Sequence, residues 1–349
     1  MIYCRKDKCK EVSHMDYVTL GKTGITVNKN GFGALPIQRV SLDDGVYLLK
    51  KAYQCGVTFF DSARGYFDSE KKIGAALSGV REKIVIATKT QAKDANAFRG
   101  ELESSLEALQ TDYIDIYQFH NPPLCPKPSD GSGLYDAMVA AKEQGKVRHI
   151  GITNHRLEVA EEAAESGLYE SIQYPFSYLA TKEETGLVEF CLKKDIGFIA
   201  MKGLAGGLIT DTAAAYAFMM QFDNVVPIWG IQKESELDEF IAFQADPPSL
   251  DERAKRVIGT DREELSGEFC RGCGYCLPCP SGIGIPIAAR MQLLMKRSSI
   301  KFYLNDYCRE SMKHAGECTN CRQCVEKCPY GIDAPRLISE SLELYNDQL

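Results

Sequence analysis

The sequence predicts an α/β protein in which a (β/α)8 TIM barrel is followed by a smaller, cysteine-rich α-helical domain. Three observations lead to this prediction. Strand-like and helix-like segments alternate eight times over roughly 230 residues, close to the length of a typical barrel of this class. Ionisable residues end several of the predicted strands. Eight of the 14 cysteines then fall in two tight groups near the end of the chain.

The composition is that of a globular protein with a sizeable core. The 349 residues include 44% hydrophobic residues and carry a formal net charge of −7. This acidic balance, with no basic stripe interleaved with aromatic residues, argues against nucleic-acid binding. No apolar run reaches the roughly 18 residues of a membrane span, and no signal peptide is recognisable, so we expect no membrane association. The clustered cysteines favour metal binding in a reducing compartment, and we therefore expect a cytoplasmic location.

Three regions are expected along the chain. Residues 1–16 form a charged N-terminal extension, residues 17–248 the barrel, and residues 249–349 the cysteine-rich domain. The boundary is placed near Pro248 because the segment ADPPSLDERAKR combines two prolines with a run of charged residues.

The first half of the barrel follows a short hairpin expected at residues 17–30. The first strand is predicted at Asn30–Ile37, and the helix after it ends before Gly56. Asp94 is the expected N-cap of a later helix. The remaining elements of this half are a strand at 57–61, a helix at 69–78, a strand at 83–89, a helix at 94–110 and a strand at 113–120.

The second half continues the alternation. We expect helices at 135–144, 155–167, 185–194, 206–222 and 234–243, and strands at 147–152, 171–178, 196–201 and 224–231. Parallel neighbours need crossover helices, and eight such strands close into a barrel. A doubly wound open sheet is the alternative, but it would usually show G-x-G-x-x-G after its first strand, and GFGALPI does not match that pattern.

Four ionisable residues lie at or just beyond the ends of three successive predicted strands. Asp61 ends one strand, and Tyr66 follows it closely. Lys89 and His120 end the next two. Each alone is more often a structural residue, such as a loop phenol, a solvated lysine or a buried histidine. Because the carboxyl ends of barrel strands open onto one mouth, the four together indicate a catalytic site.

These side chains suit the reduction of a carbonyl group. A carbonyl that accepts hydride develops negative charge on oxygen and needs a proton donor within reach. Tyr66 is a weak acid, with an ordinary pKa of about 10, unless a cation such as Lys89 favours its ionised form. Asp61 would hold the Lys89 ammonium in place. His120 would orient the carbonyl oxygen by a hydrogen bond.

The clustered cysteines form two runs. The second run has the C-x₂-C-x₂-C-x₃-C-P spacing of bacterial ferredoxins and consists of Cys318, Cys321, Cys324 and Cys328. The first run is one residue shorter before its last member and consists of Cys270, Cys273, Cys276 and Cys279. Eight thiolates suffice for two [4Fe–4S] clusters in an α-helical, ferredoxin-like domain, although the short spacing leaves the role of Cys279 open. Zinc is the weaker alternative, since zinc sites space their cysteines in two separated pairs.

The barrel region resembles the aldo-keto reductases from about Tyr17 to Phe243. The resemblance rests on LGKTGITVNKNGFG, FFDSARGY, IATK, YIDIYQFH, GKVRHIGITNH and IAMKGLAGG, which occur in this order. With the two cysteine runs, the chain is similar to the subgroup that carries a C-terminal ferredoxin-like domain. The resemblance implies that the four residues at the strand ends are the catalytic tetrad and that the cofactor is NADH or NADPH. The residues that it implies for cofactor binding are Thr153, Asn154, Gln173, Met201, Lys202, Gly203, Leu204, Gly230 and Gln232.

Two departures from the family pattern affect the cofactor. Met201 stands where the family often places a tyrosine under the nicotinamide ring. The segment after the eighth strand offers only Lys233 among four carboxylates, where the family usually carries cations for the 2′-phosphate of NADPH. We therefore expect NADH to be favoured, with Lys202 as the first candidate for a basic contact if it is not. Trp229 either lines the pocket or fills the core.

The leading hypothesis is an oxidoreductase that reduces a small aldehyde or ketone with a nicotinamide cofactor. The iron–sulfur domain is then an electron relay or a structural cap. Nicotinamide gives two electrons as hydride, whereas an iron–sulfur cluster passes one at a time, so a relay would need a flavin between them. A ferredoxin-linked, flavin-dependent reductase is therefore one alternative. A non-catalytic subunit for electron transfer or redox sensing, with an electron-transfer protein as its partner, is another.

Overall fold

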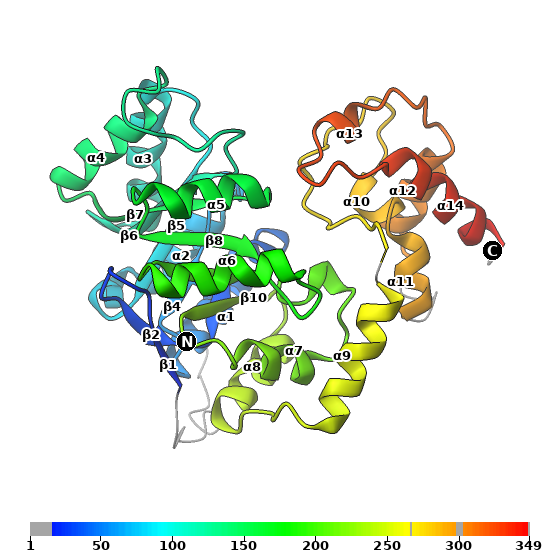
Figure 1. Cartoon of the computed structure of the whole chain (residues 1–349), viewed down its shortest axis with the longest axis horizontal. Helices are drawn as coiled ribbons and strands as arrows, with labels where there is room; N and C mark the ends of the chain where they lie inside the picture. Colours follow the sequence, from blue (N-terminus) through cyan, green and yellow to red (C-terminus); the bar gives the residue numbers. More distant parts are fainter. Residues whose placement is uncertain (1–15, 266, 298–302, 348–349) are drawn as a thin grey trace. The chain divides into compact units, whose positions relative to one another are not determined.

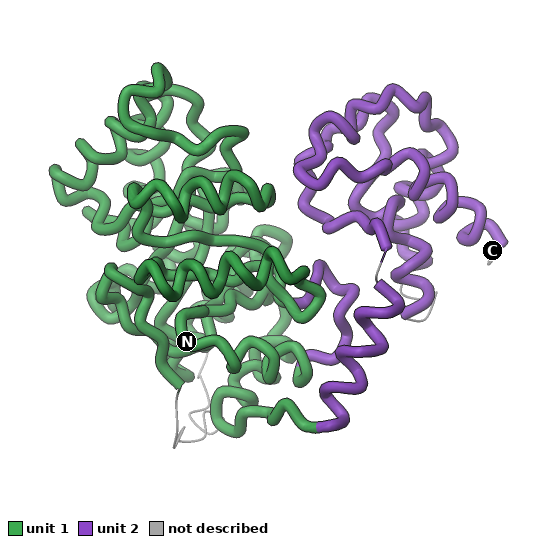
Figure 2. The backbone as a smooth tube through the Cα atoms, in the orientation of Figure 1, with its two compact units in different colours: residues 1–203, 213–251 green, residues 204–212, 252–349 purple. Residues whose placement is uncertain are grey.

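The computed structural model describes residues 16–265, 267–297 and 303–347. Apart from Asp16, the expected N-terminal extension lies outside these residues. The chain divides into two compact units (Figure 2). Unit 1 comprises Met1–Gly203 and Ala213–Asp251, and unit 2 comprises Leu204–Thr212 and Glu252–Leu349.

Unit 1 contains the barrel. An antiparallel hairpin of β1 (Tyr17–Thr19) and β2 (Thr26–Asn28) precedes it. Eight parallel strands then close on themselves, with β10 paired to both β3 and β9 (Figure 1). The barrel strands are β3 (Gly31–Gly33), β4 (Phe59–Asp61), β5 (Val85–Thr90), β6 (Ile114–His120), β7 (Val147–Thr153), β8 (Ser171–Pro175), β9 (Gly197–Met201) and β10 (Val225–Gly230). The predicted barrel is confirmed.

The crossover helices lie outside the strands (Figure 1). They are α1 (Leu42–Gln54), α2 (Ser69–Leu77), α3 (Ala95–Leu109), α4 (Leu134–Glu143), α5 (Leu157–Ser166), α6 (Lys182–Lys193), α7 (Thr212–Met219) and α8 (Glu234–Ala245). The predicted cap at Asp94 is confirmed, because its carboxylate accepts hydrogen bonds from the backbone N–H groups of Asn96 and Ala97. Gly167, in the left-handed region at φ 72°, ends α5 as expected.

Two predicted elements differ most in their bounds. The first barrel strand covers only Gly31–Gly33, since Pro36 begins a 3₁₀ turn over Pro36–Arg39. The helix predicted over 206–222 begins only at Thr212. Gly206 and Gly207, with φ of 68° and 93°, turn the chain out of the helical region before it.

The barrel interior is apolar at its centre. Its buried cluster includes Phe59, Ala87, Ile116, Ile199 and Val226, contributed by five different strands. Trp229 is 1% exposed and stacks on Phe240 with ring centroids 4.4 Å apart, so it fills the core between β10 and α8. Cys55, which is buried at the end of α1, is disulfide-bonded.

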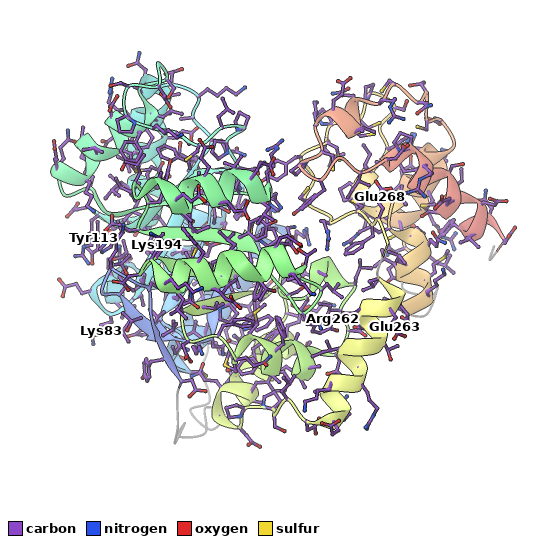
Figure 3. The ribbon with its side chains drawn as sticks, viewed as in Figure 1. Lys83, Tyr113, Lys194, Arg262, Glu263 and Glu268 are labelled. Atoms are coloured by element: carbon purple, nitrogen blue, oxygen red, sulfur yellow. The ribbon has the colours of Figure 1, made fainter. Side chains whose placement is uncertain are left out.

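Unit 2 is α-helical. Its elements are α9 (Glu252–Glu264), α10 (Ile285–Ala288), α11 (Met291–Arg297), α12 (Asp306–Ala315), α13 (Gln323–Glu326) and α14 (Ala334–Asn346). Helices α10, α12 and α14 pack on one another around a buried core that includes Ile285, Met312 and Ile338. Arg262 and Glu263 lie on the exposed part of α9 (Figure 3).

The segment Ile283–Lys313 between the two cysteine runs, for which helical structure is expected from the sequence, forms several helices. The segment is divided into α10, α11 and α12, and residues 298–302 between α11 and α12 lie outside the described part of the chain. Pro286 supplies no backbone N–H and stands in the first turn of α10, where proline is tolerated.

Among the residues described, no helix combines the length and the apolar character that a membrane span requires.

Candidate active site and cysteine centre

The four residues predicted to be catalytic come from three neighbouring strands and one loop. Asp61 ends β4, Lys89 lies near the end of β5, and His120 ends β6. These strands are paired in the order β4–β5–β6. Tyr66 stands on the loop after β4, which is fixed to β5 by a hydrogen bond from Arg64 N to Lys89 O (3.0 Å). The topology therefore brings the four to the same end of the barrel.

A buried ion pair forms the centre of this group. Lys89 Nζ lies 2.7 Å from each carboxylate oxygen of Asp61 and also donates to Ser62 O. Both side chains are almost fully buried. Burial raises the pKa of Asp61 and lowers that of Lys89, and the opposite charge of each residue offsets the burial penalty on the other. The ammonium is thus held in one position.

Two amides extend the ion pair across the barrel. Gln173 Nε2 donates to Asp61 Oδ1 (3.3 Å), and Gln118 Nε2 donates to Gln173 Oε1 (2.8 Å). Gln173 is among the residues for which the family resemblance implies cofactor binding, whereas Gln118 was not singled out. Gln118 precedes His120 by two residues on β6, and this period of two places both on the same face of the strand. The spacing of two residues between Gln118 and His120 was the signal in the sequence that could have identified Gln118.

Tyr66 and His120 lie beside the ammonium. Lys89 Nζ is 5.4 Å from the centroid of the Tyr66 ring. The His120 ring meets the Tyr66 ring edge-on, with centroids 5.6 Å apart. Burial, together with the charge of Lys89, lowers the pKa of His120 to about 3, so its imidazole is neutral near pH 7. A phenol, an ammonium and a neutral imidazole are therefore adjacent at the barrel mouth.

Most residues expected to bind the nicotinamide lie at the ends of the next three strands. Thr153 ends β7 opposite Gln173 of β8, and Met201 ends β9. Thr153 Oγ1 lies 3.8 Å from Met201 Sδ. Asn154 donates to Pro122 O (2.8 Å) and accepts from Arg156 N (2.9 Å), which fixes its side chain. These four residues are buried.

The segment after β9 has a specific backbone geometry. Lys202 has a positive φ of 59°. A Cβ on Gly203 would lie 2.7 Å from the Trp229 ring, so only glycine allows this close approach. Leu204 is the first residue of this segment that belongs to unit 2.

The acidic segment after β10 is held by internal contacts. Gln232 N and Lys233 N both donate to Glu236 Oε2, at 2.9 and 3.0 Å. Glu234 and Asp238 both pair with Lys51 of α1. Gly230 lies just before this segment and is exposed. The carboxylate of Glu236 therefore occupies the backbone amides that precede α8.

His155 was missed by the sequence analysis. It is 4% exposed and directly follows Asn154. Burial, together with the charges of Lys202, His120 and Arg156, holds the pKa of His155 well below its usual range. The signal in the sequence was GITNH, a histidine just past a buried strand, which is the same pattern that identified His120.

The cysteines of the two runs are mixed in unit 2. The electrostatic neighbours of Cys270 include Cys273 of its own run and Cys328 of the other. A cavity is lined by cysteines of both runs, namely Cys276, Cys279, Cys318, Cys321 and Cys324. The last cysteine of each run therefore lies beside members of the other run.

This arrangement fits iron–sulfur clusters. In two-cluster ferredoxins, three thiolates of one run and the fourth of the other share a cluster. Gly272 N lies 3.4 Å from Cys270 Sγ, in position to donate an N–H···S hydrogen bond. Within the described residues, no three His, Cys, Asp or Glu side chains converge as ligands of a single metal ion would. The thiols surround a space, which suits a cluster of several metal ions.

Comparison with known proteins supports both the barrel and the cysteine-rich domain. Residues 29–226 match the model of the aldo/keto reductase family, and residues 269–333 match that of a 4Fe-4S dicluster domain. The aldo-keto reductase YhdN of Bacillus subtilis is 30% identical over 223 residues, which cover 56% of this chain and 64% of that protein. An L-galactose dehydrogenase of Arabidopsis thaliana is 31% identical over 211 residues, covering 55% and 66%. The chain thus spans slightly less than two thirds of the length of these two relatives.

A further relative and two solved structures complete the comparison. An NADH-specific methylglyoxal reductase of Escherichia coli is 28% identical over 228 residues, covering 57% of this chain and 70% of that protein. An aldo-keto reductase from Bacillus halodurans, solved in its holo form, superposes with a TM-score of 0.62 at 20% identity and covers 71% of this chain and 96% of its own. One from Brucella melitensis gives a TM-score of 0.58 at 23% identity, covering 71% and 100%. These two likenesses concern the fold.

Proposed function

Since this chain belongs to the aldo/keto reductase family, we propose that it is an oxidoreductase that reduces a small aldehyde or ketone with a nicotinamide cofactor. The observation that supports this most is the group at the barrel mouth. A buried Asp61–Lys89 ion pair places an ammonium 5.4 Å from the ring of Tyr66, and His120 lies beside that ring. A silent scaffold has no need of these groups in one place.

The proposed roles follow from the charges. The nicotinamide, when bound, supplies hydride to the carbonyl carbon. Tyr66 donates its hydroxyl proton to the carbonyl oxygen as negative charge develops there. The Lys89 ammonium stabilises the phenolate that remains, and Asp61 keeps the ammonium in position. His120, neutral near pH 7, orients the carbonyl oxygen by a hydrogen bond.

The cofactor that fits best is NADH. The segment from Gly230 to Phe240 contains four carboxylates and one lysine. Glu236 already accepts hydrogen bonds from the two backbone N–H groups that a 2′-phosphate would otherwise find there. The methylglyoxal reductase of Escherichia coli is NADH-specific by name, and we extend both that preference and a small, reactive aldehyde substrate to this chain.

The cysteine centre supports a second function, one-electron transfer through two [4Fe–4S] clusters. The supporting observation is the cavity that thiols of both runs line together. Hydride transfer moves two electrons, whereas a cluster passes one, so a working relay to a partner protein would require a flavin. Anaerobically purified protein distinguishes these states by absorbance. A broad shoulder near about 400 nm indicates clusters only, and a resolved band near about 450 nm indicates flavin.

The decisive experiment measures anaerobic oxidation of NADH with methylglyoxal and a panel of small aldehydes and ketones. We expect turnover by the wild type and a loss of about 10²–10⁴-fold in Tyr66→Phe, because this change deletes the proton and keeps the ring. The matched control is Tyr113→Phe, whose ring packs between Arg81 and Arg148 just before β6 begins. Wild-type turnover in Tyr66→Phe would mean that the barrel does not work in this way.

A further inference from the structure

Arg290 connects two segments that lie far apart in the sequence. It stands between α10 and α11 in unit 2. Its Nε donates to Pro286 O (2.9 Å), and its Nη1 donates to Gly206 O (2.9 Å). Gly206 belongs to the loop that leaves the carboxyl end of β9, and this part of the loop lies in unit 2. Arg290 therefore ties that loop to the helical core of the cysteine domain.

Two glycines make room for the guanidinium. A Cβ on Gly206 would lie 2.5 Å from Arg290 Nη1, and a Cβ on Gly272 would lie 2.8 Å from the same atom. Both glycines have positive φ, 68° and 64°. The guanidinium thus lies between the loop after β9 and the turn that follows Cys270, the first cysteine of the first run. Gly272 N, in that turn, points to Cys270 Sγ at 3.4 Å.

The charge of Arg290 is buried without a carboxylate. The residue is 7% exposed, and no ion pair joins it to an acidic side chain within the described residues. A buried cation is costly unless it is compensated. The ionisable groups that favour its charged form are Cys270 and Tyr303. Within the described residues, the acceptors of its hydrogen bonds are the carbonyl oxygens of Pro286 and Gly206, and an anionic cluster held by Cys270 would compensate its charge.

We propose that Arg290 couples the loop after β9 to the iron–sulfur cluster bound by Cys270, raising its reduction potential and making that potential respond to the nicotinamide cofactor. This inference rests on the proposed function and on the resemblance to the aldo-keto reductases, which implies that the backbone around Gly203 and Leu204 approaches the pyrophosphate of the nicotinamide cofactor. It assigns a role to a residue that contacts neither the substrate nor the proton donor.

The physical basis is charge. A cluster with four thiolates becomes more negative by one unit on reduction, and its potential depends on net charge and on hydrogen bonds to sulfur. A buried cation beside it favours the reduced form. An anionic diphosphate at the loop would share the charge of Arg290 and lower the potential. Coupling between two binding equilibria is reciprocal, so reduction of the cluster weakens cofactor binding by the same factor.

The test is an anaerobic redox titration of the full chain, followed by electron paramagnetic resonance, with and without saturating NAD⁺. In the wild type, we expect NAD⁺ to lower one of the two midpoint potentials. The shift should correspond to at least a threefold change in the equilibrium constant for reduction of that cluster. In Arg290→Met without NAD⁺, the same midpoint potential falls by at least about 59 mV, which is a tenfold change in the equilibrium constant of a one-electron reduction. The response of this potential to NAD⁺ disappears. The matched control Arg309→Met, at an exposed arginine of α12, keeps both midpoints and the response.

Several outcomes overturn the proposal. One is an Arg290→Met protein with full iron content and wild-type midpoints. Another is a wild type that binds NADH, measured by fluorescence, while neither midpoint responds. If Arg290→Met loses a cluster, Arg290→Lys is measured instead. Its retained charge keeps the reduction equilibrium within tenfold of the wild type. The single ammonium cannot bridge the carbonyl oxygens of Pro286 and Gly206, so we expect the response of the midpoint potential to NAD⁺ to weaken. An unchanged response in Arg290→Lys contradicts the inference. A wild type that fails to bind NADH counts instead against the proposed function.

Discussion

At the scale of single residues, Tyr66 and Lys89 are expected to act as one unit. The ammonium is held by Asp61 and lies over the phenol ring. We predict that Lys89→Met lowers kcat/KM about as strongly as Tyr66→Phe, and that the double variant loses much less than the product of the two single losses. Steady-state kinetics of the three variants measures this, with the exposed lysine variant Lys83→Met as control. Additive losses would show that the two residues act independently.

His120 leads to a prediction about pH. Its pKa of about 3 lies below the unfolded value near 6.5, so the unfolded chain takes up the proton first and the free energy of unfolding falls as pH drops from about 6.5 toward 3. Between pH 6 and 8 the imidazole stays neutral. We therefore expect His120→Gln to lower kcat/KM while leaving the shape of the pH profile unchanged over that range. An inflection near pH 6.5 that vanishes in the variant would contradict this assignment.

At the scale of elements, the start of α8 is expected to set the cofactor preference. Glu236 accepts from Gln232 N and Lys233 N, and its charge repels a 2′-phosphate. NADH should bind at least as tightly as NADPH, and Glu236→Ala should raise the NADPH to NADH affinity ratio at least tenfold, because two amides become available. Glu239→Ala, an exposed site on the same helix, is the control. Fluorescence titrations in which wild type binds NADPH tenfold tighter, about 1.4 kcal/mol, would refute the preference.

The elements also show where local patterns suffice and where they do not. The long strands β5, β6 and β7 and the capped helix α3 lie where the sequence predicted them, because apolar runs and cap residues act over a few neighbours. The end of the first barrel strand and the start of α7 were misplaced. Both depend on turns made by Pro36, Gly206 and Gly207, which the apolar periodicity of the segment does not show.

At the scale of the whole molecule, the two cysteine runs predict the metal content. Eight thiolates in two mixed groups should hold about eight irons and eight sulfides per chain. Cys279 lines a cavity with three cysteines of the second run, so Cys279→Ser should lose iron and sulfide toward about four of each. Cys308→Ser, at a buried thiol of α12, should not. Full iron in Cys279→Ser would mean that this thiol is not a ligand.

Much of this protein was determined by the sequence alone. The barrel, the helical cysteine domain and the four residues of the candidate active site follow from periodicity, strand ends and cysteine spacing, which are properties of short stretches of chain. The tertiary structure decided which distant side chains meet: the Gln118–Gln173–Asp61 amide chain, the burial of Trp229 against Phe240, and the pairing of Glu234 with Lys51. It also placed Arg290 between Gly206 and Gly272. Such contacts join residues from 11 to 183 positions apart, and no local pattern encodes them because they depend on how the packed elements bring those residues together.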